Sequence, residues 1–203
     1  EGKLSITAIT DEVLVEIKGN TKTETYNGEE QFVEGYSVTI PKDSAYTEKD
    51  IKFNGTAKAK GTDAGGEYKM GLTAGNFTNN NTNFTNVTFV VKDGSLTITK
   101  RKVQLTSEGG SKVYDGTPLT KPEVTMPTEN NQGFIASEIK ELKATGSVTN
   151  VSEGEVTNTI TYTLNDGKLE SNYDITKNEG KLSITAITDE VLVEIKGNTK
   201  TET

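Results

Sequence analysis

The sequence contains no cysteine and no histidine, and Arg101 is the only arginine among its 22 basic residues. Without cysteine there is no disulfide framework and no thiolate metal site. Without histidine the chain lacks the commonest general base and the usual transition-metal ligand, and its many Ser and Thr residues have no histidine to activate them. No carboxylate pair stands out among the 30 acidic residues. We therefore expect no enzymatic activity, no catalytic residue, no metal and no cofactor.

Large apolar residues are also scarce. Leu, Ile, Val and Phe make up roughly a fifth of the chain, close to the composition at which disorder becomes the default. Those present alternate with polar residues, which favours ordered strands. The net charge of −8 disfavours nucleic acid and anionic membranes as partners, and no stretch approaches the ~20 apolar residues of a membrane span. We expect neither a nucleic-acid partner nor membrane insertion.

The sequence does contain one long repetition: residues 1–25 and 179–203 are the same 25 residues. A strand position tolerates many apolar choices, so packing alone does not enforce such identity. The copies lie 178 positions apart, which predicts one full period of a longer tandem array and the start of the next. The partners that we expect are neighbouring identical repeats in the same chain.

Each period contains two diverged copies of a smaller unit. The turn sequence Tyr26-Asn27-Gly28 corresponds to Tyr114-Asp115-Gly116 at an offset of 88 residues. Near the end of each copy, the run 92–99 corresponds to 178–185 at an offset of 86. Loop insertions account for such a drift, so the period holds two domains of similar build.

This alignment sets the predicted domain boundaries at 11–100 and 101–188. Residues 1–10 are then the last strand of the preceding repeat, and residues 189–203 are the first strand of the following one. The frame of the chain cuts across domains, so we expect both ends to lack their pairing partners. Domains of under 100 residues are near the low end of what folds alone.

Strand patterns dominate both domains. Residues 13–17 and 102–105 alternate and open their domains, and 156–164 is the cleanest strand pattern of the chain. Asn-Gly and Asp-Gly pairs mark the turns. These features predict an all-β fold of tandem, small, antiparallel β-sandwich domains of immunoglobulin-like type in an elongated array. The alternative is a β-grasp-like domain, which a helix packed across a sheet at 135–142 would favour; 45–51 is the other short segment with helical character.

Three motifs recur in the same order in both domains. They are Lys112-Val113-Tyr114-Asp115-Gly116-Thr117, the Gly-rich run 63–68 with its altered copy 151–156, and Asn172-Tyr173-Asp174-Ile175 leading into 180–185. In order and content they resemble the bacterial surface repeats known as MBG and YDG domains and, more loosely, the immunoglobulin-like repeats of Gram-positive adhesins. Val156 departs from the pattern where Tyr68 predicts a tyrosine. The resemblance covers nearly the whole chain and implies an extracellular, wall-attached or secreted modular protein without catalytic residues.

Tyr26 and Tyr114 are the candidate glycan contacts, because they occupy equivalent positions ahead of a turn. An exposed tyrosine ring could stack against a sugar. The competing and favoured interpretation is an aromatic at the edge of the core that covers the turn and bonds its hydroxyl to the backbone.

The asparagine-rich run 76–88 carries four of the six Asn-x-Ser/Thr sequences of the chain. In a eukaryotic secreted protein this would indicate a glycan cluster. In a bacterial surface repeat we favour a polar hairpin loop that is anchored by Phe77 and Phe84.

Two further chemical features stay open at this point. One is a Ca²⁺ site built from acidic residues near a domain junction, although no dense Asp spacing supports it over solvated charges; its candidates are Asp63, Glu67, Glu153 and Glu155. The other is an internal amide bond of the kind found in some Gram-positive surface domains, which would need a desolvated lysine near its partner; its candidates are Lys18 or Lys102 with Asn172.

The function that these patterns favour is a structural stalk segment of a large repetitive bacterial cell-surface adhesin or fibre, projecting a distal functional region. High identity between periods fits a stalk, because recombination changes its length without changing its chemistry. The first alternative is a multivalent repeat that binds host glycans or mucin weakly and gains avidity from copy number. The second is a self-associating extracellular filament subunit.

Overall fold

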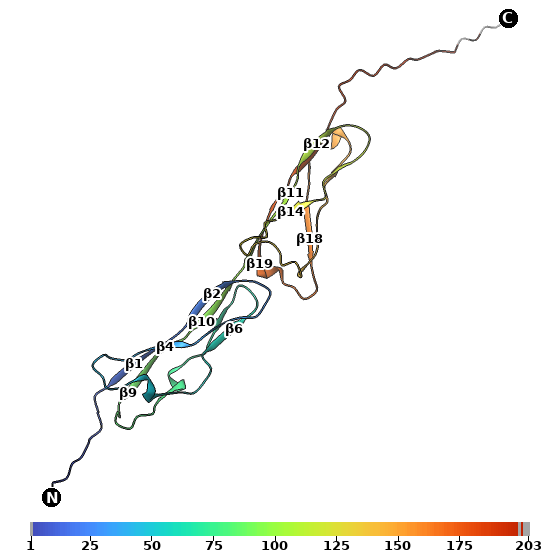
Figure 1. Cartoon of the computed structure of the whole chain (residues 1–203). Helices are drawn as coiled ribbons and strands as arrows, with labels where there is room; N and C mark the ends of the chain where they lie inside the picture. Colours follow the sequence, from blue (N-terminus) through green and yellow to red (C-terminus); the bar gives the residue numbers. More distant parts are fainter. Residues whose placement is uncertain (1, 199, 201–203) are drawn as a thin grey trace. The chain divides into compact units, whose positions relative to one another are not determined.

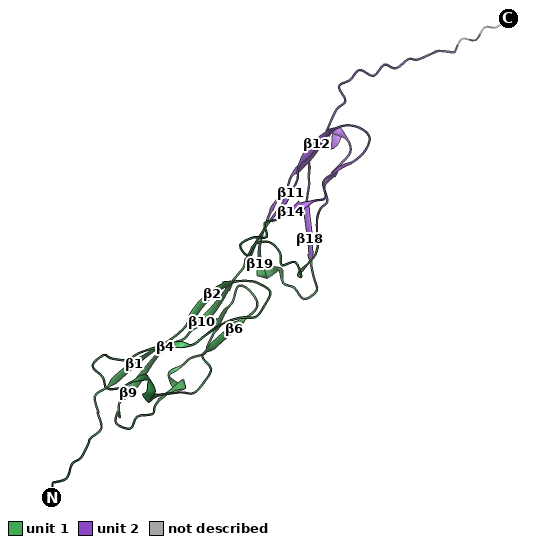
Figure 2. Ribbon diagram, viewed as in Figure 1, with its two compact units in different colours: residues 1–104, 127–140, 164–176 green, residues 105–126, 141–163, 177–203 purple. Residues whose placement is uncertain are grey.

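The computed structural model of the chain describes residues 2–198 and 200 (Figure 1). Over this part the regular structure consists of β-strands and short 3-10 turns, with no α-helix, which confirms the all-β prediction. The chain folds into two compact units (Figure 2). Unit 1 comprises residues 1–104, 127–140 and 164–176, and unit 2 comprises residues 105–126, 141–163 and 177–203.

The strands are short and numerous. Unit 1 contains β1 (Val13–Gly19), β2 (Thr21–Thr25), β3 (Gln31–Glu34), β4 (Tyr36–Thr39), η1 (Glu48–Asp50), β5 (Ile51–Phe53), β6 (Lys58–Gly61), β7 (Glu67–Lys69), η2 (Ala74–Asn76), β8 (Phe77–Asn79), β9 (Val87–Lys92), β10 (Ser95–Thr99) and η4 (Glu170–Asn172). Unit 2 contains β12 (Gly110–Val113), β13 (Leu119–Thr120), β14 (Val124–Thr125), β16 (Ser147–Val148), η3 (Val151–Glu153), β17 (Val156–Thr157) and β20 (Lys181–Thr185). The strands with residues in both units are β11 (Arg101–Ser107), β15 (Ile139–Ala144), β18 (Ile160–Leu164) and β19 (Tyr173–Asn178).

In unit 1 the opening strands of the first repeat lie beside its closing strands. β1 lies between β4 and β9, and β10 lies between β2 and β7. β1 runs parallel to β9, and β2 runs parallel to β10, whereas β4 and β7 pair with the same central strands in antiparallel fashion. The smaller pairs β3–β6 and β5–β8 are antiparallel.

The all-β class is therefore confirmed, and the predicted antiparallel pairing is found in most strand pairs, but β1–β9 and β2–β10 pair in parallel. A parallel pair needs a connection of at least about a dozen residues, and the whole body of the repeat provides it between its first and last strands. Unit 2 uses the same arrangement, because β12 pairs parallel with β20 while β17 pairs antiparallel with β20. Local turn signals in the sequence predict hairpins and carry no information about this long-range pairing.

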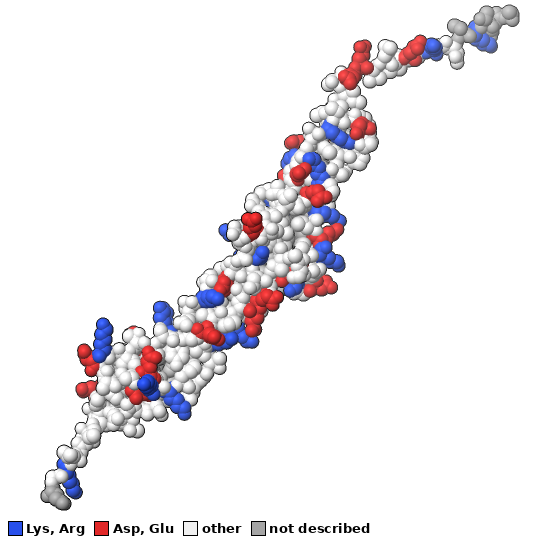
Figure 3. All heavy atoms as spheres, viewed as in Figure 1, with Lys and Arg blue, Asp and Glu red and all other residues white. Residues whose placement is uncertain are grey.

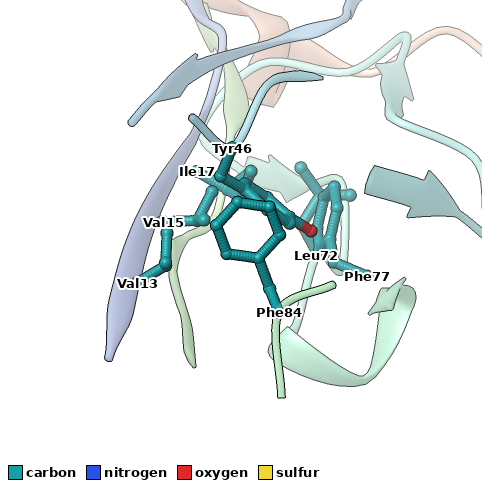
Figure 4. Packing of buried hydrophobic residues seen from close by; sticks show 7 residues of the cluster. All are labelled: Val13, Val15, Ile17, Tyr46, Leu72, Phe77 and Phe84. Atoms are coloured by element: carbon teal, nitrogen blue, oxygen red, sulfur yellow. The ribbon is translucent and has the colours of Figure 1, made fainter. Parts of the chain in front are cut away.

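The core of unit 1 is built on the strict alternation of β1, in which Val13, Val15 and Ile17 are buried and their neighbours are exposed. Tyr46, Leu72, Phe77 and Phe84 complete the cluster (Figure 4). The rings of Tyr46 and Phe84 meet edge to face with centroids 5.1 Å apart. Both phenylalanines that were expected to anchor the asparagine-rich loop are thus buried.

The core of unit 2 is smaller and includes a buried amide. Val148 and Leu182 are fully buried and pack together with Ile184. Nearby, the Asn158 side chain is also fully buried. Its Oδ1 accepts the Gly146 amide proton at 3.0 Å, and its Nδ2 donates to the Glu108 and Lys121 carbonyls at 3.0 and 2.8 Å. This amide replaces ladder hydrogen bonds where the strands are too short to supply them.

The segment 135–142 is not a helix. Residues 136–138 form a turn, and β15 begins at Ile139. The helix that the β-grasp alternative requires at this place is therefore absent. In the segment 45–51 the helical character is limited to the single 3-10 turn η1, which leads directly into β5.

The identical end segments adopt different structures in this chain. Leu182 and Ile184 in β20 are 0% and 5% exposed, whereas Leu4 and Ile6, in the same sequence, are 103% and 96% exposed and lie in no strand. Conversely, residues 13–19 form β1, but the identical described residues 191–197 form no strand. Within the described residues, the two predicted end strands lack pairing partners, apart from one bridge at Ile9. Residues 1, 199 and 201–203 of these two segments lie outside the described residues.

Candidate functional site

A buried carboxylate in unit 1 accepts hydrogen bonds from two tyrosines. Glu138 is 1% exposed and closes a turn in which its N–H donates to the Ile135 carbonyl at 2.8 Å. The Tyr26 hydroxyl donates to Glu138 Oε1 at 2.8 Å, and the Tyr173 hydroxyl donates to Oε2 at 2.6 Å. The two rings meet edge to face with centroids 5.5 Å apart. We call these three residues the tyrosine–glutamate cluster.

Backbone structure places each member of the cluster. Tyr26 directly follows β2, and its N–H donates to the carbonyl of Thr99, the last residue of β10, at 2.9 Å. Tyr173 is the first residue of β19 and follows the 3-10 turn η4. Tyr26 belongs to the first sequence repeat, whereas Glu138 and Tyr173 belong to the second. The cluster therefore joins the two repeats inside one compact unit.

Charge and hydrogen bonding set the protonation of the cluster. Lys168 Nζ lies 3.1 Å from Glu138 Oε1. Burial by itself would raise the pKa of Glu138, but the hydrogen bonds from Tyr173, Tyr26 and Lys168 hold this pKa below its usual value. Burial and the bond to the carboxylate raise the pKa of Tyr26 to about 12, and the same causes raise the pKa of Tyr173. At neutral pH the glutamate is charged and both tyrosines are protonated.

This arrangement is suited to holding structure together. Both oxygens of Glu138 are occupied by protein donors, and both hydroxyl protons are used inside the cluster. Across the part of the chain that the structure describes, no buried side-chain nitrogen or oxygen lacks a hydrogen-bond partner. A network that is fully satisfied in this way makes its surroundings rigid and leaves no group to bind a substrate.

A second polar contact in the same unit also joins the repeats. Asn172 is 1% exposed; its Oδ1 accepts the Ala64 amide proton at 2.7 Å, and its Nδ2 donates to Asp63 Oδ1 at 2.9 Å. Both polar atoms of the amide therefore have protein partners. Lys18 and Lys102, the lysines considered for an internal amide bond with Asn172, are both exposed, so neither is the desolvated amine that the reaction needs.

The only arginine of the chain fixes the link between the repeats. Arg101 follows β10 after a single residue and opens β11. Its Nε donates to the Gly133 carbonyl at 2.7 Å, and its Nη2 donates to the Gln132 carbonyl at 2.8 Å. The planar guanidinium can hold two carbonyls at once, which a lysine cannot do with the same geometry.

Tyr114 lies in a different environment from Tyr26. Its ring is 40% exposed, next to a turn in which Asp115 Oδ1 accepts from Lys112 Nζ at 2.8 Å and from the Thr117 amide at 2.9 Å. The lysine and threonine bonds lower the pKa of Asp115. Stacking of a sugar on Tyr26 requires an exposed ring, and this ring is only 2% exposed; at Tyr114 the glycan contact stays a prediction.

The acidic residues considered for Ca²⁺ are engaged locally. Asp63 binds Asn172, Glu67 pairs with Lys69 at 2.7 Å, and Glu153 accepts the Asn150 amide proton in a capping box at 2.6 Å. No group of three or more potential ligands with metal-binding geometry occurs among the described residues. The structure brings no set of these carboxylates together.

The visible surface mixes charges of both signs on each unit (Figure 3). Many are paired at the surface, such as Lys60 with Glu30 at 3.1 Å in unit 1 and Lys143 with Glu141 at 2.7 Å in unit 2. Exposed pairs of this kind contribute little to stability. None of the described segments forms a helix that is long and apolar enough to cross a membrane.

Comparison with known families supports the sequence interpretation. Residues 14–100 match the family model described as the MBG domain. This confirms the predicted MBG-type repeat for that stretch, which runs from the second residue of β1 to the residue after β10. MBG is a non-enzymatic repeat domain family found in surface proteins. No curated protein and no solved structure matches the chain.

Sequence reasoning found part of this site. Tyr26 was singled out for its recurrence, and the favoured interpretation correctly made it a core-edge aromatic, but it assigned the hydroxyl to the backbone. Asn172 and Tyr173 were part of a recurring motif and received no role in packing. Glu138 carries no signal that separates it from the other acidic residues, because its partners lie 112 and 35 positions away.

Proposed function

We propose, from the MBG match and the tyrosine–glutamate cluster, that this chain is a structural stalk segment of a large repetitive bacterial adhesin or fibre. It is exported and lies at the cell surface, wall-attached or secreted. Its role is to project a distal functional region away from the cell. The chain provides length, and its neighbours in the same polypeptide are its partners.

The observation that carries the proposal is the burial of Glu138 between tyrosines from two successive repeats. A stalk needs joints that resist bending, and a fully bonded buried carboxylate resists separation because each group left behind would be buried without a partner. The two hydrogen bonds of the Arg101 guanidinium and the bond between Asn172 and Ala64 also connect the first repeat to the second. These contacts support a stiff connection between consecutive repeats.

Small-angle X-ray scattering on a chain of two complete periods tests this function. β1 and β2 together span Val13–Thr25, and a strand rises by about 3.3 Å per residue, so each repeat should extend the particle by about 40 Å. A maximum dimension that grows by about 80 Å per added period is the expected result. A compact particle would refute the stalk.

A second candidate is a repeat that binds glycan or mucin weakly and many times over. The observation in its favour is the partly exposed ring of Tyr114. A glycan array probed with the chain and with its Tyr114→Ala variant tests this idea. Binding that disappears in the variant would support it, and equal signals from the two proteins would oppose it.

A third candidate is a self-associating filament. Leu4, Ile6, Val191 and Ile195 are exposed in segments whose identical copies form β20 and β1, so another molecule could supply their pairing partners. Sedimentation velocity over a range of concentrations tests it. Concentration-dependent growth of the particle would favour filaments, and a constant monomer would exclude them.

A further inference from the structure

Tyr26 and Tyr114 have the same backbone setting and very different exposure. The Tyr26 N–H donates to the carbonyl that ends β10, and the Tyr114 N–H donates to the carbonyl of Thr185 that ends β20, both at 2.9 Å. Yet Tyr26 is 2% exposed and Tyr114 is 40% exposed. Because the strand ends are equivalent, the difference must come from what covers each ring.

The glycines in the two turns, Gly28 and Gly116, differ in the same way: the first is covered by other residues and the second is open. A methyl group added at Gly28 would lie 3.1 Å from Ile135 Cδ1 and 3.0 Å from a Glu138 oxygen, whereas one added at Gly116 would meet nothing within 4 Å. The first turn is therefore covered by the segment 135–138 of the following repeat. The second turn is open, and in a tandem array the repeat that follows it begins at residue 189.

Unit 1 carries a cavity of about 360 Å³ at the start of its first repeat. Its walls include Ile9, Val13, Pro41, Ala45 and Phe84, and we call it the socket. In the first repeat, the connection between Pro41 and β5 supplies part of the socket wall, at residues 43–45. In the second repeat, the connection between Pro127 and β15 supplies the residues that cover the Tyr26 turn. Both surfaces therefore come from the same connection of the repeat.

Connectivity brings Tyr114 to this socket in an array. Ile9 is fixed at the socket, because its N–H donates to the Asn83 carbonyl at 2.7 Å and its carbonyl accepts the Thr85 amide proton at 3.1 Å. Ile187 is the same residue one period later. It lies two positions after Thr185, a span of about 7 Å at most. The carbonyl that holds Tyr114 thus lies beside the socket of the next period.

We propose that the Tyr114 ring of each period inserts into the socket of the period that follows, so that the next period of the same polypeptide completes the site. The inference rests on the proposed function as a tandem array. The socket offers apolar walls for the ring, and the acidic residues Asp11 and Asp43 also line it, so the phenolic hydroxyl has polar surroundings there. Every joint of the array then buries one tyrosine, Tyr26 at one joint and Tyr114 at the next.

A tryptophan reporter tests the insertion, since the natural chain contains no tryptophan. The Tyr114→Trp change is made in the 203-residue chain and in the first period of a chain extended by the rest of the next period. We expect red-shifted emission and strong acrylamide quenching in the short chain, with a blue shift and several-fold weaker quenching in the long one. Equal emission and quenching in the two chains would overturn the proposal.

A matched pair of variants shows where the reporter goes. Ala45→Arg, made in the second period only, fills the socket and should restore quenching. Thr56→Arg in the same period is also an exposed change but lies outside the socket, and it should leave the reporter protected. If both variants or neither restore quenching, Tyr114 does not occupy the socket.

Nitration of the natural tyrosines tests the same insertion without the tryptophan reporter, whose indole ring is larger than the phenol ring of Tyr114. With tetranitromethane, the peptide containing Tyr114 should be fully modified in the 203-residue chain and only half modified in the two-period chain, because the last copy stays open. Full modification in both chains contradicts the insertion. Scattering separates this result from the stalk itself: a long particle with an exposed reporter refutes the insertion alone, and a compact particle with a shielded reporter refutes the stalk alone.

Discussion

Replacement of Glu138 by alanine removes the centre of the tyrosine–glutamate cluster. The change deletes the acceptor of two tyrosine hydroxyls and of Lys168. Hydrogen bonds to a charged group contribute about 1.5–3 kcal/mol each, and breaking a buried ion pair from one side costs about 3–5 kcal/mol. Since these contributions overlap, we expect Glu138→Ala to lower the free energy of unfolding by about 3–5 kcal/mol.

Urea unfolding followed by far-ultraviolet circular dichroism measures this loss. With a slope of about 2 kcal/mol per M, the midpoint for unit 1 should fall by about 2 M. Glu138→Gln should lose less, because the amide oxygen still accepts one hydroxyl while its NH₂ group cannot accept the other. Glu30→Ala is the matched control, since Glu30 is an exposed acid paired with Lys60 and its loss should cost no more than about 1 kcal/mol. A Glu138→Ala variant as stable as this control would refute the argument that the buried carboxylate holds the joint.

The remaining predictions concern pH, identical residues in two settings, and one close backbone approach. Folding lowers the pKa of Glu138, so the charged carboxylate stabilises the folded state above about pH 4.3, the usual pKa of an unfolded glutamate. This stabilisation is lost as the pH falls through the folded pKa. The urea midpoints of the wild type and Glu138→Gln should therefore converge in acid. Leu182→Ala should cost about 2–5 kcal/mol in unit 2, whereas Leu4→Ala, in the same local sequence, should be within about 0.5 kcal/mol of the wild type when both are measured by thermal unfolding. Gly19→Ala would place its methyl group against the backbone of Gly94. It should lower the free energy of unfolding of unit 1 by at least about 1 kcal/mol, as measured by urea unfolding.

Each of these has a result that would contradict it. A constant gap between the wild type and Glu138→Gln down to pH 2 would mean that folding does not lower the pKa of Glu138. Equal losses for the two leucine variants would mean that residues 3–7 are packed as β20 is. Gly75 is the control for Gly19, because a methyl group there would lie 3.7 Å from its nearest neighbour; equal losses at Gly19 and Gly75 would refute the close approach.

The strand pattern of the first repeat could be predicted well from the sequence. The alternation of residues 13–19 gives β1 and its buried face, and the domain match over 14–100 agrees with the motifs that were recognised. The parallel pairing of β1 with β9 could not be predicted, because it joins residues more than 70 positions apart and depends on the path of the whole repeat.

The repeated segments show most clearly what a local sequence leaves undetermined. Residues 3–7 and 181–185 are identical, and only the second set forms a strand. β20 has β12 and β17 as partners, while residues 3–7 have none among the described residues. Strand formation here is set by partners and burial and not by propensity. Glu138 was missed for the same reason, since its role depends on tertiary neighbours.

Scattering from chains of one, two and four periods tests the central claim most directly, because it measures whether length grows with copy number. If buried joints make the array stiff, the maximum dimension should grow linearly with the number of periods. Growth closer to the square root of that number, as in a flexible chain, would contradict the stalk and the stiff joints on which it depends.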